Sequence, residues 1–217
     1  MEKKTTKRII IADDHAVVRT GLQMILDATS DLCICDEASH GQELIDKLRN
    51  RHFDLVILDI SMPGKDAFDV LREIRSAWNK LPVVIFTMNS DEFFAVRMIR
   101  NGASAYINKE TNPNQIIEIL RTVLSGKKHI SSAQAEILAN IVTGTEVKNQ
   151  VRHELLTDRE FQIMFMLASG IKKSVIAEKL SVSKYTIGNH RNNILKKMNL
   201  STNSDLTRYA IRQGIIK

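Results

Sequence analysis

The chain has 217 residues and a formal net charge of +6, and its shares of apolar residues (43%) and charged residues (26%) are those of an ordinary globular protein. This length accommodates one large domain or two ordinary ones. No uninterrupted apolar run approaches the ~20 residues that a membrane-spanning helix needs, and no charged-then-apolar N-terminal signal is found. We therefore expect a cytoplasmic protein and exclude a membrane-embedded one.

Strand-like apolar runs recur through the first 128 residues, and each is followed by an amphipathic helical pattern. The runs are "RIIIA", "LCIC", "DLVILDI", "PVVIFT" and "SAYIN". Strands that alternate with helices are typical of an α/β domain, and near-continuous apolar strands fit burial on both faces of the sheet. We predict a domain with five parallel strands over residues 1–128.

The second strand-like run contains both cysteines of the chain, Cys33 and Cys35. Residues two apart on a strand face the same side of the sheet. Two thiols without nearby histidines make a poor zinc site. Core packing is therefore a better interpretation than a disulfide or a metal site.

The remainder of the chain is predicted to be helical after a linker. Residues 129–153 contain one short helical pattern and then a polar stretch, which indicates the linker. Residues 154–217 show four short helices, with capping-box spacing at Thr157 and Glu160, an N-cap at Ser183, and the same spacing at Thr202 and Asp205. We predict a second, all-α domain of four helices.

The positive charge is concentrated in the second domain. Residues 151–217 contain 12 Lys and Arg against 5 Asp and Glu, whereas the preceding residues contain 19 against 20. A basic domain of this size suggests a polyanionic partner, although solvated lysines on helix surfaces are the common alternative.

Polar residues follow the predicted strands at one end. Asp13 and Asp14 follow the first strand, Asp59 the third, Thr87 ends the fourth, and Lys109 follows the fifth. Ligands of open parallel sheets bind outside the carboxyl ends of the strands, so we expect these side chains to meet at one edge. Taken alone, the Asp13–Asp14 pair would equally well cap the helix that begins there.

Three clustered carboxylates repel one another unless a cation joins them. All-oxygen ligands with room for water and phosphate oxygens suit Mg²⁺. Such a pocket fits phosphoryl transfer to Asp59, because a carboxylate can form an aspartyl phosphate when nearby charge is neutralised. Lys109 would pair with the phosphoryl oxygens. The hydroxyl of Thr87 could donate a hydrogen bond to one of these oxygens.

The combination of paired acids, "LDISMPG", Thr87 and "KE" after "GASAYIN" resembles the receiver domain of two-component response regulators over roughly residues 7–126. The resemblance implies a flavodoxin-like fold, phosphorylation of Asp59 by a histidine kinase, and Thr87 and Tyr106 as switch residues. It also implies Mg²⁺ held by Asp14, Asp59 and the backbone carbonyl of Ser61, with Asp13 assisting through water. The chain departs from many receivers at Glu110, where they carry proline after the lysine.

The run "SVIAEKLSVSKYTIGNHRNNILKKM" has an apolar helix, a short turn and a second helix, which is the helix-turn-helix pattern. On the second helix Ile187, Ile194 and Met198 share one face, and polar residues occupy the other. A solvated surface would be the ordinary interpretation of that polar face. Its asparagines are poor helix formers, however, and this favours a face that reads a DNA groove.

This region resembles the LuxR-type C-terminal domain of NarL/FixJ response regulators over about residues 154–217. The resemblance implies binding of double-stranded promoter DNA. The candidate contacts are Lys184, Tyr185, Thr186, Gly188, Asn189, His190, Asn192, Lys196 and Lys197. The chain departs at Gly188, where many relatives carry a longer side chain, and at Met198, which replaces leucine.

We therefore expect a transcriptional response regulator and not a conventional enzyme. Phosphorylation is expected to produce a homodimer, with Leu206, Tyr209 and Ala210 on the last helix as the candidate contact. Two other interpretations stay open. In one, the receiver acts through protein contacts without binding DNA; in the other, the acidic pocket belongs to a phosphate-ester hydrolase of similar sheet topology.

Overall fold

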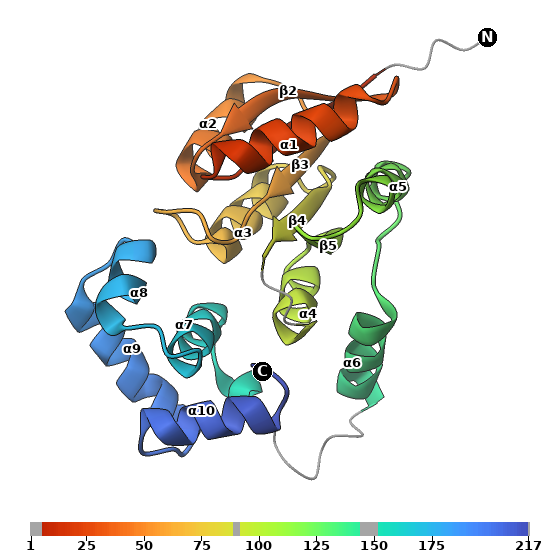
Figure 1. Ribbon diagram of the computed structural model, residues 1–217. Coiled ribbons are helices and arrows are strands. Elements are labelled where there is room, and N and C mark those ends of the chain that lie inside the picture. The colour runs from red at the N-terminus through yellow and green to blue at the C-terminus, as the bar shows by residue number, and fades with distance from the viewer. Residues whose placement is uncertain (1–5, 89–91, 144–151, 217) are drawn as a thin grey trace. The chain divides into compact units, whose positions relative to one another are not determined.

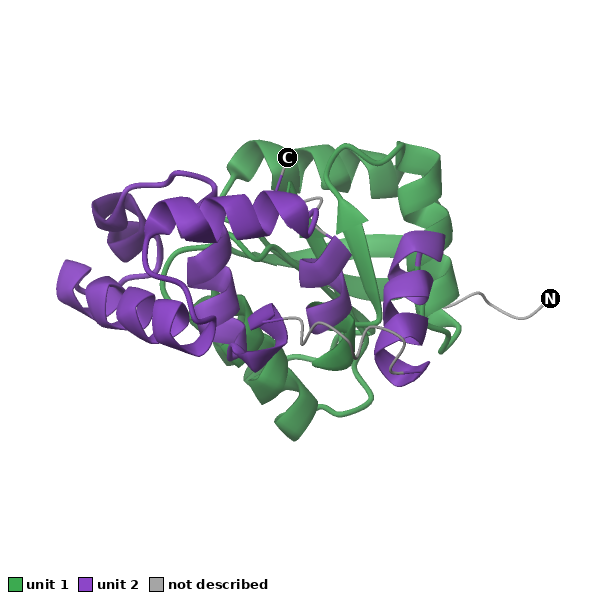
Figure 2. Cartoon of the chain, turned by 90° about the horizontal axis from the view of Figure 1, so that it is seen from below, with its two compact units in different colours: residues 1–90, 98–130 green, residues 91–97, 131–217 purple. Residues whose placement is uncertain are grey.

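The computed structural model describes residues 6–88, 92–143 and 152–216 (Figure 1). It divides into two compact units, residues 1–90 with 98–130 and residues 91–97 with 131–217 (Figure 2). The domain limits expected from the sequence, 1–128, 129–153 and 154–217, stay a prediction. No helix in the described part of the chain is long and apolar enough to cross a membrane.

The first unit is built on a five-stranded parallel sheet, which confirms the predicted fold class. The strands are β1 (Lys7–Ala12), β2 (Leu32–Ala38), β3 (Leu55–Leu58), β4 (Val83–Thr87) and β5 (Ala105–Asn108), and their order is β2-β1-β3-β4-β5. The crossover from β2 over β1 to β3 places β1 and β3 side by side, with Ala12 paired to Leu58. The residues that follow these two strands therefore emerge next to each other.

Helices cover both faces of this sheet. The first unit contains α1 (Ala16–Asp27), α2 (Gly41–Asn50), α3 (Ala67–Ala77) and α5 (Pro113–Leu124), and α4 (Glu92–Arg100) bridges the division between the units. Ile9 and Ile11 of β1 pack in one core with Leu22 and Leu26 of α1 and with side chains of α5. Ile10, between them, is also fully buried, so both faces of the central strand are covered. This explains the near-continuous apolar strands of the sequence.

Local signals start several of these helices. The side chain of Asp66 accepts a hydrogen bond from the backbone N–H of Phe68 at the start of α3. Asn112 caps α5 in the same way, and Pro113 occupies the first turn, where a missing backbone N–H costs nothing. Cys33 and Cys35 of β2 are both partly buried free thiols, as their strand position suggested.

The second unit is helical. It contains α6 (Ser132–Thr143), the short 3₁₀ helix η1 (Arg152–Leu155), α7 (Asp158–Ala168), α8 (Lys173–Lys179), α9 (Lys184–Lys197) and α10 (Asn203–Arg212). The predicted capping boxes are present at Thr157–Glu160 and at Thr202–Asp205. The short helix of the predicted linker is α6, whereas the polar stretch 144–151 lies outside the described residues.

Two residues of the expected dimer contact point into the core of the helical unit. Leu206 and Ala210 are completely buried, on the face of α10 that packs against α7. Tyr209 is partly buried, and its hydroxyl lies 3.0 Å from Nδ1 of His153. The proposed contact is therefore corrected: the apolar spacing on this helix serves its own core, and Leu206 and Ala210 are not available to a second copy.

A buried cation anchors η1 within the same unit. Arg97 is 7% exposed and donates hydrogen bonds to the backbone carbonyls of His153 (2.6 Å) and Leu156 (3.0 Å). Its guanidinium lies 4.3 Å from the ring centroid of Phe161, and it forms an ion pair with Asp158 at 3.3 Å. Carbonyls, a ring face and a carboxylate together compensate the charge that burial would otherwise destabilise.

Candidate functional site

The predicted strand-end residues meet at the carboxyl edge of the sheet. Asp13 and Asp59 directly follow the neighbouring strands β1 and β3, and the backbone N–H of Asp59 donates to the carbonyl of Ala12 at 2.9 Å. Lys109 follows β5, and its backbone N–H donates to the carbonyl of Thr87 at 2.9 Å. The ladder of parallel strands thus brings residues far apart in the chain to one rim.

Lys109 lies between two buried carboxylates. Its ammonium is 2.9 Å from Oδ2 of Asp59 and 2.6 Å from Oδ2 of Asp13. Both aspartates are only 1% exposed. The three side chains therefore form a charged cluster that is almost completely removed from water, where each interaction is stronger than at the surface.

Burial and pairing shift the pKa values of this cluster in specific directions. Burial raises the pKa of Asp59 above its usual range, against the hydrogen bond and positive charge of Lys109. Burial alone would lower the pKa of Lys109, but its close pairing with the carboxylates of Asp13 and Asp59 outweighs that effect and raises it. Lys109 is therefore a firmly protonated partner for a carboxylate that is costly to ionise.

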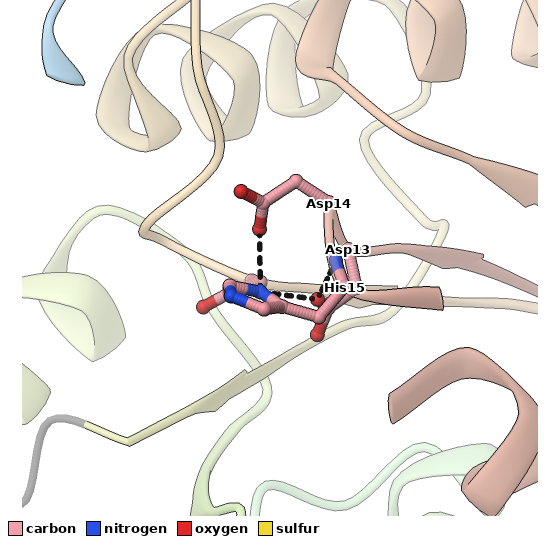
Figure 3. Close-up of side chains that lie close together, drawn as sticks. Asp13, Asp14 and His15 are labelled. Atoms are coloured by element: carbon pink, nitrogen blue, oxygen red, sulfur yellow. Dashed lines mark hydrogen bonds and ion pairs between the residues drawn. The ribbon is translucent and has the colours of Figure 1, made fainter. Parts of the chain in front are cut away.

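The segment Asp13–Asp14–His15 completes the acidic cluster (Figure 3). Nδ1 of His15 lies 2.8 Å from Asp14 and 3.4 Å from Asp13, and the backbone N–H of His15 donates to Asp13 at 2.8 Å. The N-cap of α1 is His15, and neither aspartate caps the helix through its side chain. This excludes the capping interpretation of the pair. His15 was not among the predicted site residues, although it directly follows the pair in the sequence.

The geometry of the acidic cluster fits a metal ion. Ligand atoms of Asp13, Asp14, His15 and Asp59 all lie within 4.8 Å of one another. Oδ2 of Asp13 is buried and, within the described residues, contacts Lys109 without the angles of a hydrogen bond. When ionised, the three carboxylates exceed the single charge of Lys109. A hard cation that takes oxygen ligands would satisfy both the free lone pairs and the excess charge.

The other predicted pocket residues lie on β4, on β5 and in the loop after β3. The backbone N–H of Ser61 donates to Oδ1 of Asp59 at 3.2 Å, which fixes the loop after β3. Thr87 is completely buried at the end of β4, and Tyr106 on β5 is 8% exposed. Every peptide bond that the structure describes is trans, including the one before Glu110.

The second candidate site is the outer face of α9. Ile187, Ile194 and Met198 are completely buried, as their spacing predicts. Tyr185 is 78% exposed, and Asn189, Asn192 and Lys196 are exposed. Apart from its two chain neighbours and the backbone of its own helix, no described residue has an atom within 4 Å of where a Cβ on Gly188 would be. The face is thus polar and basic, with an open position at Gly188.

Several predicted contact residues of α9 already have partners. Lys197 forms an ion pair with Glu160 at 2.7 Å, and this carboxylate also closes the capping box at Thr157. Lys197 is nevertheless exposed, so a contact with phosphate would replace this ion pair, and its role in DNA binding stays a prediction. The hydroxyl of Thr186 lies 2.8 Å from that of the N-cap Ser183. Lys184 is exposed and His190 partly exposed.

A basic hollow of about 480 Å³ was missed by the sequence reasoning. It lies where the loop before α8 meets the first turns of α9 and α10. Its lining includes Lys172, Lys173, Lys184, Asn203 and Ser204. The adjacent lysines at 172 and 173 were visible in the sequence, but only the packing of three helices places them beside Lys184.

The comparison with protein families agrees with both sites. Residues 9–121 match the response regulator receiver domain, and residues 154–210 match the bacterial regulatory proteins of the luxR family. The chain is a response regulator with a LuxR-type DNA-binding domain. Its acidic pocket lies in the receiver, and its basic face lies on the second helix of the helix-turn-helix.

Similar proteins match this response regulator over nearly its whole length. It is 35% identical to the oxygen regulatory protein NreC of Staphylococcus carnosus over 214 residues, covering 96% of this chain and 99% of NreC. It is 30% identical to the response regulator UvrY of Escherichia coli, covering 95% and 94% of the two chains. Transcription regulation as a two-component response regulator is therefore the function of this chain.

Solved structures support the fold. The RcsB response regulator of Salmonella typhimurium shares 22% identity with this response regulator, with a TM-score of 0.71 over 94% of this chain and 96% of that one. A LuxR-family response regulator from Aurantimonas shares 27% identity and a TM-score of 0.58 over 64% of this chain and 99% of its own.

Proposed function

We propose that Asp59 is the phosphoryl acceptor of this response regulator and that its phosphorylation by a histidine kinase controls promoter binding through α9. The observation that carries the proposal is the position of Asp59, buried beside Asp13 and 2.9 Å from the ammonium of Lys109. A carboxylate nucleophile needs nearby positive charge, because the incoming phosphoryl group is itself an anion.

The charge balance of the pocket supports Mg²⁺ as the cofactor. Asp13, Asp14 and Asp59 would hold the ion together with the backbone carbonyl of Ser61, and Asp13 would act through water. When bound, Mg²⁺ neutralises the carboxylates and the charge that develops on the transferring phosphoryl group. Oxygen ligands favour this ion, whereas His15 already has Asp14 as a partner at 2.8 Å.

Lys109 and Thr87 have separate roles in the proposal. Lys109 exchanges its ion pair with Asp59 for an ion pair with the phosphoryl oxygens, because phosphorylation turns a single-charged carboxylate into a group with about −1.5 to −2 charges. The hydroxyl of Thr87 donates a hydrogen bond to another phosphoryl oxygen. Tyr106, two residues before the end of β5, follows the rearrangement of the loop after β4.

DNA binding is proposed to use the exposed face of α9. The contact residues are Tyr185, Gly188, Asn189 and His190 with Asn192 and Lys196, flanked by Lys184 and Thr186. Lys172 and Lys173 extend the basic surface toward phosphates. The solved structure of RcsB from Salmonella enterica bound to a promoter in the presence of a phosphomimetic matches this chain with a TM-score of 0.68 at 22% identity. A homodimer on two half-sites is part of the proposal, with its contact outside the buried residues of α10.

The first experiment tests the acceptor. Wild type, Asp59→Asn and the exposed control Asp69→Asn are incubated with acetyl phosphate, with and without Mg²⁺, and their masses are measured. We expect one phosphoryl group on wild type and on the control, only with Mg²⁺, and none on Asp59→Asn. Full labelling of Asp59→Asn would overturn the assignment.

The second experiment separates DNA binding from the alternatives. Genomic footprinting with and without phosphorylation provides the promoter, and gel shifts on it at several salt concentrations should show an affinity that falls steeply with salt. A receiver that acts by protein contact alone would show no such binding. Repeated turnover of small phosphate esters, in place of stoichiometric labelling, would favour a hydrolase.

A further inference from the structure

The first unit has a hollow at the opposite end of the sheet from Asp59. It measures about 620 Å³ and lies where α2 joins β3 and α3 joins β4, at the amino ends of these strands. Its lining consists of residues 48–54 and 78–82. Pockets that bind small molecules commonly have volumes of roughly 300 to 1,000 Å³, so the size suits a small ligand.

Apolar and aromatic residues form part of the lining of the hollow. Phe53 and Leu48 are each 4% exposed. Trp78, the only tryptophan of the chain, also lines the hollow and is partly exposed. Part of the indole surface is therefore open to a ring placed in the hollow.

Both walls are held in place by arginines that lie outside the hollow. The guanidinium of Arg75 donates to the carbonyls of Asn79, at 3.0 Å, and of Leu81, which fixes the turn after α3. Arg8 donates to the carbonyl of His52 at 3.2 Å on the other side. A hollow with fixed walls loses little entropy when a ligand binds.

The charge of the hollow is positive. Arg49 and Arg51 line it but are paired with Glu73 and Asp36, and Asp54 is paired with Lys7. By contrast, the side chains of Lys80 and His52 have no hydrogen bond or ion pair with any described residue. They are the groups of the lining that are free to meet an anion.

We propose that this hollow binds a small ligand that combines an aromatic ring with an anionic group. The ring packs against the exposed part of Trp78, and the anionic group meets Lys80 and His52. A concave shape, a partly exposed indole, and a lysine and a histidine without a described side-chain partner together favour this chemistry over a flat protein partner. The proposal does not depend on phosphorylation, because Asp59 lies at the other end of β3.

Nuclear magnetic resonance on the ¹⁵N-labelled full chain tests the proposal, because Trp78 supplies the only indole N–H signal. Salicylate and AMP carry both a ring and an anion, inorganic phosphate lacks the ring, and adenosine lacks the charge. We expect salicylate or AMP to shift the Trp78 signal saturably at or below about 1 mM, and phosphate and adenosine to bind at least tenfold more weakly. Which of the two binds identifies the source as an aromatic acid or a nucleotide.

Substitutions locate the binding. Lys80→Glu, which removes a charge-assisted contact, and separately His52→Ala, which removes a hydrogen-bonding group, should each weaken binding by about tenfold, whereas the exposed control Lys128→Glu should not. Asp59→Asn should bind as wild type does. The proposal fails if neither aromatic anion shifts Trp78, if phosphate or adenosine binds equally well, or if Lys128→Glu weakens binding as much as Lys80→Glu.

Discussion

The ammonium of Lys109 lies 2.9 Å from Oδ2 of Asp59, although β4 separates the strands that these residues follow. The same ammonium lies 2.6 Å from Asp13. One cation thus holds two buried carboxylates together. Phosphorylation of Asp59 would break the ion pair between Lys109 and the Asp59 carboxylate.

Replacing Lys109 with Gln should raise the pKa of Asp59 further. Burial already raises this pKa, and Lys109 is the main effect that opposes burial. An opposite charge at this distance lowers a carboxyl pKa by about 1 to 3 units, and its removal should raise the pKa by a similar amount. A ¹³C titration of the Asp59 carboxyl measures this, with Lys128→Gln as the control. An unchanged titration would mean that Lys109 does not set the charge of the acceptor.

Mg²⁺ should stabilise the first unit, and more strongly at higher pH. The raised pKa of Asp59 means that the folded chain binds a proton more readily than the unfolded chain, so metal-free stability falls as pH rises through that pKa. Mg²⁺ at about 100 times its Kd should add about 3 kcal/mol. Unfolding followed by Trp78 fluorescence measures this. Asp13→Asn should lose most of the Mg²⁺ effect, and a variant that keeps all of it would remove Asp13 from the ligand set.

Adjacent lysines of α9 should affect DNA binding differently. Lys196 is exposed, whereas the ammonium of Lys197 is 2.7 Å from Glu160. Lys196→Ala should weaken binding to all sequences and lower the salt slope by about one unit. Lys197→Ala should change the slope less and reduce stability instead, because it leaves Glu160 without its cation. Gel shifts at several salt concentrations measure the salt slope of each variant. Equal salt slopes for Lys196→Ala and Lys197→Ala would contradict the prediction that the two lysines differ.

Asn192→Ala should change sequence preference without changing the salt slope. Asparagine can pair bidentately with adenine, and one such contact supplies roughly 1 to 3 kcal/mol of discrimination. Within the described residues, the side chain of Asn192 has one long hydrogen bond, accepted from Arg191 at 3.4 Å. Selection from random DNA should show a relaxed preference at one or two base pairs. An unchanged motif would place a different face of α9 in the groove.

The helical unit should lose stability in acid because of His153. Burial lowers the pKa of His153 to about 4, and Arg97 acts in the same direction. The unfolded chain then binds a proton near pH 6.5, whereas the folded chain binds it only near pH 4. The free energy of unfolding should therefore fall by on the order of 3 kcal/mol as the pH drops from 6.5 to 4. Unfolding followed by circular dichroism should show this, while Trp78 fluorescence reports the first unit. His153→Phe should flatten the pH dependence of the helical transition, and an equally steep fall in that variant would assign the effect to other groups.

Local patterns were sufficient to predict the elements and the strand-end residues. Successive side chains of a strand alternate, and capping residues act within one helical turn, so the sheet, the capping boxes at Thr157 and Thr202, and the buried face of α9 could be predicted residue by residue. The order of Asp13, Asp59, Thr87 and Lys109 along the chain was likewise readable, because parallel strands end at one edge.

Distances across the fold could not be predicted in this way, because they depend on strand order, register and helix packing, which join residues far apart in the chain. Packing turned the apolar face of α10 inward and buried Leu206 and Ala210, and it drew Lys197 to Glu160. The contact of Lys109 with two carboxylates and the hollow beside Trp78 arise for the same reason, since no local pattern contains the partner residue.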